Sequence, residues 1–230
     1  MRIAHYGVLS ASLLLATAAT AWANGGGGMP MAMPMPPRQA TPQDQARDAY
    51  NDGVRYVKKA DRYAGDATQQ SDAGKKEKAT KEAHDNYGSA LGKFETAVQL
   101  DPSLYEAWNY LGYTNRKLGD YDDALAAYGK ALSIKPGYAD ALEYRGEAYL
   151  GVNRVSDAQQ AYLDLYPSNR QLASKLLTAM KAYVATQRAT PSAGTTTASL
   201  DDLDKWIHER EQIAGQTAAL TRAGAAASWH

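Results

Sequence analysis

The sequence contains no cysteine, and its only phenylalanine stands against 16 tyrosines. Without cysteine the chain forms no disulfide and has no thiolate to act as a nucleophile or a metal ligand. It also lacks a Gly-rich phosphate loop, and its four histidines lie far apart in the sequence. The 25 basic and 25 acidic residues cancel, so nothing indicates a general affinity for nucleic acid or anionic lipid. These absences predict a protein that is not an enzyme and needs no cofactor.

The first 23 residues have the features of a signal peptide. Arg2 supplies a positive start, residues 7–19 are apolar or small, and Ala21-Trp22-Ala23 has the A-x-A form of a cleavage site. The apolar run is too short to span a bilayer. We therefore expect residues 1–23 to be removed during export to the periplasm, or during secretion, with no membrane insertion afterwards.

Residues 24–42 form a Gly/Met/Pro-rich leader, which is predicted to be disordered because proline lacks a backbone donor and restricts φ. Met29, Met31, Met33 and Met35 place four thioethers within a short stretch. Such soft donors hold Cu(I) without histidine or cysteine. Because Met and Pro also alternate in flexible leaders, the favoured interpretation is that no metal binds. Periplasmic copper handling by this leader stays as an alternative.

Residue types recur at a fixed spacing of 34 positions in the middle of the chain. A period of this length, with small and aromatic residues at fixed offsets, indicates stacked helix-turn-helix units that cannot bury their apolar faces alone. The residues that repeat are Ala90, Ala124 and Ala158; Phe94, Tyr128 and Tyr162; Pro102 and Pro136; and Gly112 and Gly146.

The second unit carries the fullest pattern. Its first helix contains Trp108-x2-Leu111-Gly112, its second contains Ala124-x3-Tyr128, and a proline closes the unit. In this pattern the chain resembles a tetratricopeptide repeat (TPR) protein. The resemblance implies an all-α fold, a TPR-type helix-turn-helix solenoid of about three units, in a domain over residues 43–167.

The predicted units cover residues 46–104, 105–138 and 139–167, and the first contains an insertion. The interval between Gly53 and Gly112 exceeds one repeat period by 25 positions. The inserted residues 60–84 contain no proline, so we expect them to lengthen both helices into an extended hairpin that turns near residues 72–74. The lysines of this insertion lie among glutamates, which is typical of a solvated helix.

Residues 168–213 are predicted to form capping helices. Leu172, Leu176 and Met180 have the spacing of an amphipathic helix. A further helix is expected to begin at Ser199, with Asp202 completing a capping box. Because a repeat array exposes apolar surface at its end, these helices are expected to cover the third unit. Residues 214–230 are predicted to be a flexible tail.

The TPR resemblance also implies a binding surface, because in this family the first helix of each unit lines a groove. Such a groove, aromatic at the first unit and acidic at the third, suits a peptide with basic residues beside an aliphatic or aromatic one. The implied function is a non-catalytic scaffold or adaptor of the bacterial cell envelope whose partner is another protein or peptide. An accessory subunit of an envelope enzyme or secretion complex is a second alternative. The residues that the resemblance places in the groove are Tyr50, Val54 and Val57; Glu106, Asn109, Tyr113 and Arg116; and Asp140, Glu143 and Glu147.

Overall fold

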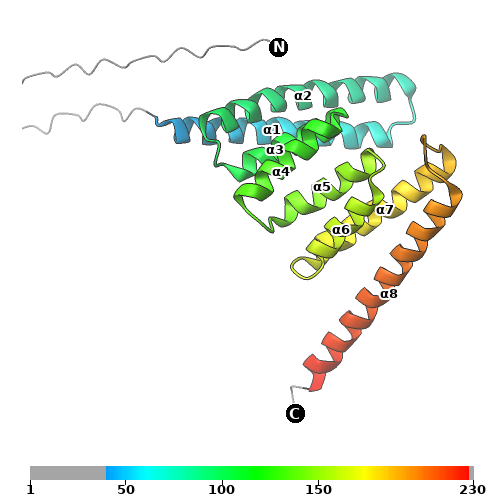
Figure 1. The fold of residues 1–230 in the computed structure, drawn as a ribbon. Helices are drawn as coiled ribbons and strands as arrows, with labels where there is room; N and C mark the ends of the chain where they lie inside the picture. Colours follow the sequence, from blue (N-terminus) through cyan, green and yellow to red (C-terminus); the bar gives the residue numbers. More distant parts are fainter. Residues whose placement is uncertain (1–39, 228–230) are drawn as a thin grey trace, which may run out of the picture. The chain divides into compact units, whose positions relative to one another are not determined.

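Residues 40–227 are described by a computed structural model, with side chains placed for residues 40–220. The described chain is all helical, which confirms the predicted all-α class (Figure 1). None of its helices combines the length and the apolar character that a bilayer span requires. The predicted signal peptide and the leader up to residue 39 lie outside the described residues. The helices are α1 (Pro42–Gln69), α2 (Ala73–Leu100), α3 (Tyr105–Leu118), α4 (Tyr121–Ile134), α5 (Ala139–Gly151), α6 (Val155–Leu165), α7 (Arg170–Ala189) and α8 (Thr197–Ala227).

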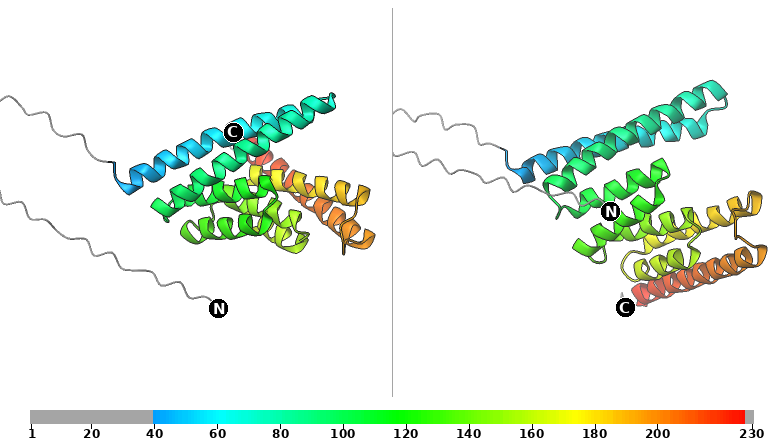
Figure 2. Two further views of the ribbon diagram at one scale, coloured as in Figure 1. Left: turned by 90° about the horizontal axis from the view of Figure 1, so that it is seen from above. Right: turned by 45° about the horizontal axis from the view of Figure 1, so that its top comes forward.

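Four antiparallel helix pairs stack in chain order from α1/α2 to α7/α8 (Figure 2). Each pair contacts the next: α2 packs on α3, α4 on α5, and α5 and α6 on α7. The first three pairs are the predicted repeat units, so the solenoid is confirmed.

The first helix pair is much longer than the others. Helices α1 and α2 have 28 residues each, against 14 each for α3 and α4, which confirms the extended hairpin. Thr41 and Asp44 form a capping box at the start of α1, satisfying backbone donors that the first turn leaves unpaired. Asp72 caps α2 by accepting a hydrogen bond of 2.8 Å from the backbone N of Lys75. The hairpin therefore turns where the sequence predicts.

The fixed spacing of the repeat places a glycine of each first helix against a large side chain. A Cβ atom on Gly112 would lie 2.7 Å from the ring of Tyr128, which is fully buried in α4. At Gly146 in the third unit the neighbour is instead Leu176 of α7, at 2.5 Å. Glycine is needed at both positions because any side chain would overlap its neighbour.

Helices α7 and α8 cover the third unit, as predicted for capping helices. Leu176, Met180 and Ile207 are fully buried, and the ring of Trp206 lies 5.3 Å from that of Tyr162 in an edge-on contact. Their burial removes from water the apolar surface that α5 and α6 would otherwise expose.

The limits of α8 differ from the prediction at both ends. Thr196, rather than Ser199, caps the helix: the backbone N of Ser199 donates to the Oγ1 of Thr196 over 3.1 Å, and the first helical residue is Thr197. At the other end the helix continues to Ala227, through most of the predicted flexible tail. The alanines of this stretch have the highest helix propensity, which favours continuation beyond the last packing contact.

Candidate partner-binding groove

The first helices of the three units form one continuous surface, the inner face, to which α7 adds a fourth helix. Helix α3 contacts α1 on one side and α5 on the other, and α5 contacts α7. Residues at equivalent positions of the repeat on these helices therefore lie side by side in space.

A row of tyrosines crosses the inner face from α1 to α5. The ring centroids of Tyr50 and Tyr110 lie 5.7 Å apart, those of Tyr110 and Tyr113 6.3 Å, and those of Tyr113 and Tyr144 5.1 Å. All four side chains are half-buried, so each has one surface in the core and another in solvent. We call these four residues the tyrosine row. Such amphipathic rings supply large contact areas at protein interfaces.

Two carboxylates lie at one edge of the tyrosine row, in the first turns of α3 and α5. Glu106 and Asp140 are partly exposed, and within residues 40–220 neither makes an ion pair. Burial first, then the neighbouring Tyr110 and Glu106, raises the pKa of Tyr50 to about 12. Burial and then Asp140 raise the pKa of Tyr138 strongly. The negative charge of Glu106 and Asp140 therefore acts on the aromatic rings around them.

The same edge already binds one ammonium group of the chain itself. The Nζ atom of Lys135 lies 4.3 Å from the ring centroid of Tyr105 and 5.1 Å from that of Tyr138, and it donates to the Tyr105 hydroxyl over 2.8 Å. Attraction between a cation and the negative face of an aromatic ring accounts for this arrangement.

The opposite edge of the row holds an ion pair and a further cation, Lys117, which makes no ion pair within residues 40–220 and whose Nζ atom lies 5.4 Å from the ring centroid of Tyr113. Arg116 pairs with Glu147 over 2.6 Å, and both side chains are mostly buried. The Arg116 guanidinium also lies 5.3 Å from the ring centroid of Tyr113 and 5.6 Å from that of Tyr144. Arg116 therefore joins α3 to α5 and holds the middle of the tyrosine row in place.

Three residues predicted to face the groove are buried instead. Val57 belongs to the core around Phe94, and Asn109 is 1% exposed. The side chain of Glu143 is also 1% exposed, and one of its oxygens accepts a hydrogen bond of 3.1 Å from Nζ of Lys175 in α7. The prediction of an accessible Glu143 is wrong because α7 packs against α5 at this point.

Burial has a second effect on Glu143. Desolvation, followed by the hydrogen bond and the charge of Glu147, raises its pKa from the ordinary 4.5 to about 8, while Lys175 acts in the opposite direction. The acidic end predicted for the groove is therefore reduced to Asp140. Glu143 is buried and Glu147 pairs with Arg116, whereas Asp140 stays partly exposed beside the tyrosines.

The remaining predicted residues, Tyr50, Val54, Glu106, Tyr113, Arg116, Asp140 and Glu147, are partly exposed on the inner face, and their role in binding stays a prediction. Tyr110 and Tyr144 were not predicted as groove residues, although they lie one period apart and share one position of the repeat. Lys175 was not predicted either, because α7 lies outside the repeated units and the repeat gives no signal for it.

The hypothesis of copper binding by the leader is not tested by the described residues. The four leader methionines, Met29 to Met35, lie outside them. Among residues 40–220, no three histidine, aspartate or glutamate side chains gather where they could hold an ion.

Comparison with protein families finds a match in the second unit. A family model described as tetratricopeptide repeat matches residues 105–138, which span α3 and α4. No curated protein matches the chain.

Several solved structures are similar at low sequence identity. The first TPR of Spaghetti (RPAP3) bound to an HSP90 peptide is 15% identical with a TM-score of 0.40, over 58% of this chain and 94% of that one. The first TPR domain of human RPAP3 is 14% identical with a TM-score of 0.42, over 61% and 98%. The MamA protein is 18% identical with a TM-score of 0.40, over 75% and 95%.

Proposed function

This chain is a tetratricopeptide repeat protein, and we infer from its inner face that it is a non-catalytic scaffold of the bacterial cell envelope. Its partner is a protein whose peptide segment lies across the tyrosine row and carries a Lys or Arg beside an aliphatic or aromatic residue. The envelope location depends on the predicted signal peptide. The accessory-subunit alternative is a narrower form of the same role, with the enzyme or secretion complex as the partner.

The observation that carries this proposal is the position of Glu106 and Asp140. Both carboxylates are accessible, neither makes an ion pair within residues 40–220, and both lie beside half-buried tyrosines. A cation placed there gains from the carboxylates and from the faces of the aromatic rings. Lys135 on Tyr105 and Tyr138 is an example of such a contact within the chain.

The rest of the inner face suits the apolar part of the segment. The middle of the tyrosine row presents ring surface. Beyond it Arg116 is paired with Glu147, and the remaining cations, Lys117 and Lys175, lie on the rings of Tyr113 and Tyr144. The carboxylates of Glu106 and Asp140 at one edge, and these cations at the other, would therefore set the direction in which the segment lies. Aromatic contacts would contribute most of the binding free energy, and charge would select the partner.

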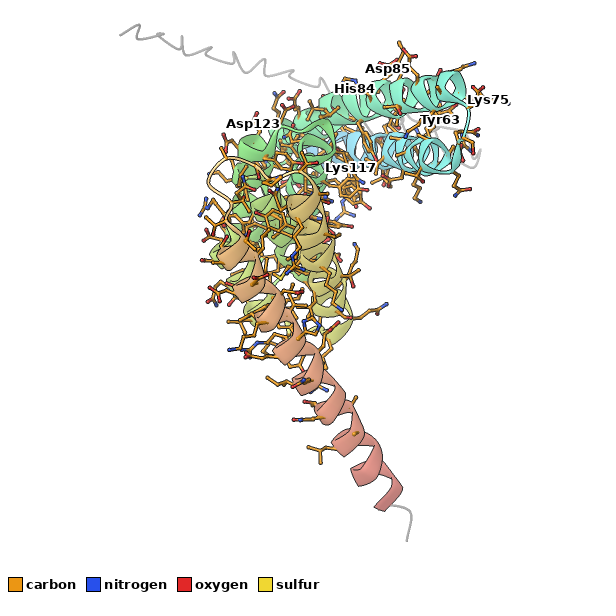
Figure 3. The ribbon with its side chains drawn as sticks, turned by 90° about the vertical axis from the view of Figure 1, so that its right-hand side faces the viewer. Tyr63, Lys75, His84, Asp85, Lys117 and Asp123 are labelled. Atoms are coloured by element: carbon orange, nitrogen blue, oxygen red, sulfur yellow. The ribbon has the colours of Figure 1, made fainter. Side chains whose placement is uncertain are left out.

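The test is affinity capture from periplasmic extract, followed by calorimetry with the captured partner. Replacing Glu106→Gln together with Asp140→Gln should weaken binding by about 1 kcal/mol or more and reduce its salt dependence. The matched control is Glu95→Gln with Asp123→Gln, which removes the same charge from an exposed surface formed by α2 and α4 (Figure 3 labels Asp123). Circular dichroism would verify that both variants fold.

A second pair of variants examines the tyrosine row. Tyr50→Ala should lower the affinity, whereas Tyr56→Ala, which removes an exposed tyrosine from the same helix, should not. Equal affinities for all four variants would show that the partner does not bind the inner face.

A further inference from the structure

A second surface lies on the extended part of the first hairpin, where α1 and α2 continue beyond the end of α3 (Figure 1). Up to that point α3 covers the hairpin. The rings of Tyr87 and Tyr113 lie 6.5 Å apart, and both hydroxyls donate to the carboxylate of Asp61. Helix α3 then ends at Leu118, and Gly119, with a φ of 96°, turns the chain away. The face of the hairpin that α3 covers is therefore left without a covering helix over its outer part.

This outer part is hollowed into a groove of about 530 Å³, which we call the hairpin groove. Its floor consists of small side chains from both helices, among them Ala64, Ala67 and Ala83, and Tyr87 closes the end nearest α3. Two antiparallel helices with small residues between them form a channel into which the ridge of a third helix packs. Because α3 packs on the same face further along, a helix is the shape that continues the packing.

All the ionisable side chains of Lys, His, Asp and Glu type that line the hairpin groove are basic. Lys76 of α2 and Lys117 of α3 line it together with His84, and no aspartate or glutamate does (Figure 3 labels His84 and Lys117). Within residues 40–220 neither lysine makes an ion pair, whereas Lys81, on the same hairpin, pairs with Asp85 over 2.6 Å. Burial, and then the charge of Arg116, lowers the pKa of Lys117, so an anion near it would be favoured.

We propose that the hairpin groove binds an acidic amphipathic α-helix of a partner protein, with its apolar ridge on the alanines and its carboxylates on Lys76 and Lys117. This site is separate from the inner face, because its charge is opposite and it lies on the inserted residues. The insertion is thereby explained as an added binding surface, in which Lys76 lines the groove while Lys81 pairs with Asp85 at the surface.

A second copy of this chain is the less suitable occupant. The C-terminal part of α8, residues 212–227, is the helical segment that a copy would offer, and it contains no aspartate or glutamate. The exposed Ile213 and Leu220 would match the floor of the groove, but nothing in that segment would match its lysines.

The experiment uses the full chain and two labelled peptides of about 18 residues, long enough to form helices. One carries Leu and Ala on one face and Glu on the other, and the second has Lys in place of every Glu. Fluorescence anisotropy should show that the Glu peptide binds and that the Lys peptide binds at least about tenfold more weakly. Failure of the Glu peptide to bind, or equal binding of both peptides, would overturn the proposal.

Variants then locate the site. Lys76→Glu with Lys117→Glu should weaken the Glu peptide at least about tenfold, whereas Lys78→Glu with Lys130→Glu, the same change of charge outside the groove, should alter it less than about twofold. Thr80→Trp fills the groove without changing charge and should also abolish binding. If the control pair weakens binding as much as the groove pair, the interaction is nonspecific attraction and the proposal fails.

Two further measurements separate the alternatives. The Glu106→Gln and Asp140→Gln variant of the inner face should bind the Glu peptide with the affinity of the unmodified chain. The hairpin groove and the inner face are therefore tested independently of each other. Light scattering tests the second copy. Self-association of the unmodified chain that Thr80→Trp abolishes would identify another copy as the occupant and refute the acidic partner.

Discussion

Replacing Gly112 by alanine should destabilise the chain, although alanine is the better helix former. The added Cβ would lie 2.7 Å from two atoms of the Tyr128 ring, closer than non-bonded carbon atoms approach. Tyr128 is fully buried, and its ring also lies 6.3 Å from that of Tyr144, so it has no free space into which to move. The second unit therefore has to open between α3 and α4.

The size of the effect follows from two opposing terms. Overpacking of this kind lowers the free energy of unfolding by about 1 to 3 kcal/mol, and replacing glycine by alanine inside a helix raises it by about 1 kcal/mol. Gly129→Ala is the matched control, because Gly129 lies in α4, next to Tyr128, and a Cβ there would have no atom within 4 Å. At Gly129 only the gain in helix propensity applies, so Gly129→Ala should stabilise the chain.

Thermal unfolding followed by far-UV circular dichroism measures both variants. For a chain of this size 1 kcal/mol corresponds to about 2 to 4 °C, so the midpoint of Gly112→Ala should lie roughly 2 to 12 °C below that of Gly129→Ala. Gly112→Leu should lower it further. Midpoints for the two alanine variants that agree, or a more stable Gly112→Ala, would refute the close packing of α3 on α4 at this residue.

Three other predictions concern ionisation, capping and processing. Because the pKa of Glu143 is about 8 when folded and about 4.5 in an unfolded chain, the folded state retains a proton that the unfolded chain releases, and stability should fall between about pH 5 and pH 8. Glu143→Gln should flatten that slope in thermal melts, and parallel slopes would contradict the raised pKa. Ending the chain before Thr197 should lower the melting temperature, because Leu203 and Ile207 leave the core, whereas ending it after Ala214 should not. If both truncations melt alike, α8 is an appendage rather than a cap. N-terminal sequencing should show that the exported protein begins at Asn24, and retention of Met1 would exclude cleavage of a signal peptide.

The repeat period determined the core of the units without help from the structure. It relates Gly112 to Gly146 and Phe94 to Tyr128, and each stands at a close contact between helices. The extended hairpin was equally predictable. The insertion lies between the two helices of the first unit and contains no helix-breaking proline, so it can only lengthen both helices. The tyrosine row could also have been predicted, since Tyr110 and Tyr144 are one period apart. Local spacing suffices for these features because each depends on residues within one unit or on neighbouring units of the same kind.

The charges of the two candidate sites were decided only by tertiary packing. Glu143 has the spacing of a groove residue, yet α7 buries it and supplies Lys175, and Arg116 neutralises Glu147 across two helices. The hairpin groove likewise exists because α3 ends at Leu118 while α1 and α2 continue, so that Lys117 of α3 and Lys76 near the start of α2 line one groove although they are far apart in the sequence. The net charge of a surface depends on which side chains meet, and segments distant in sequence meet only when the helices pack.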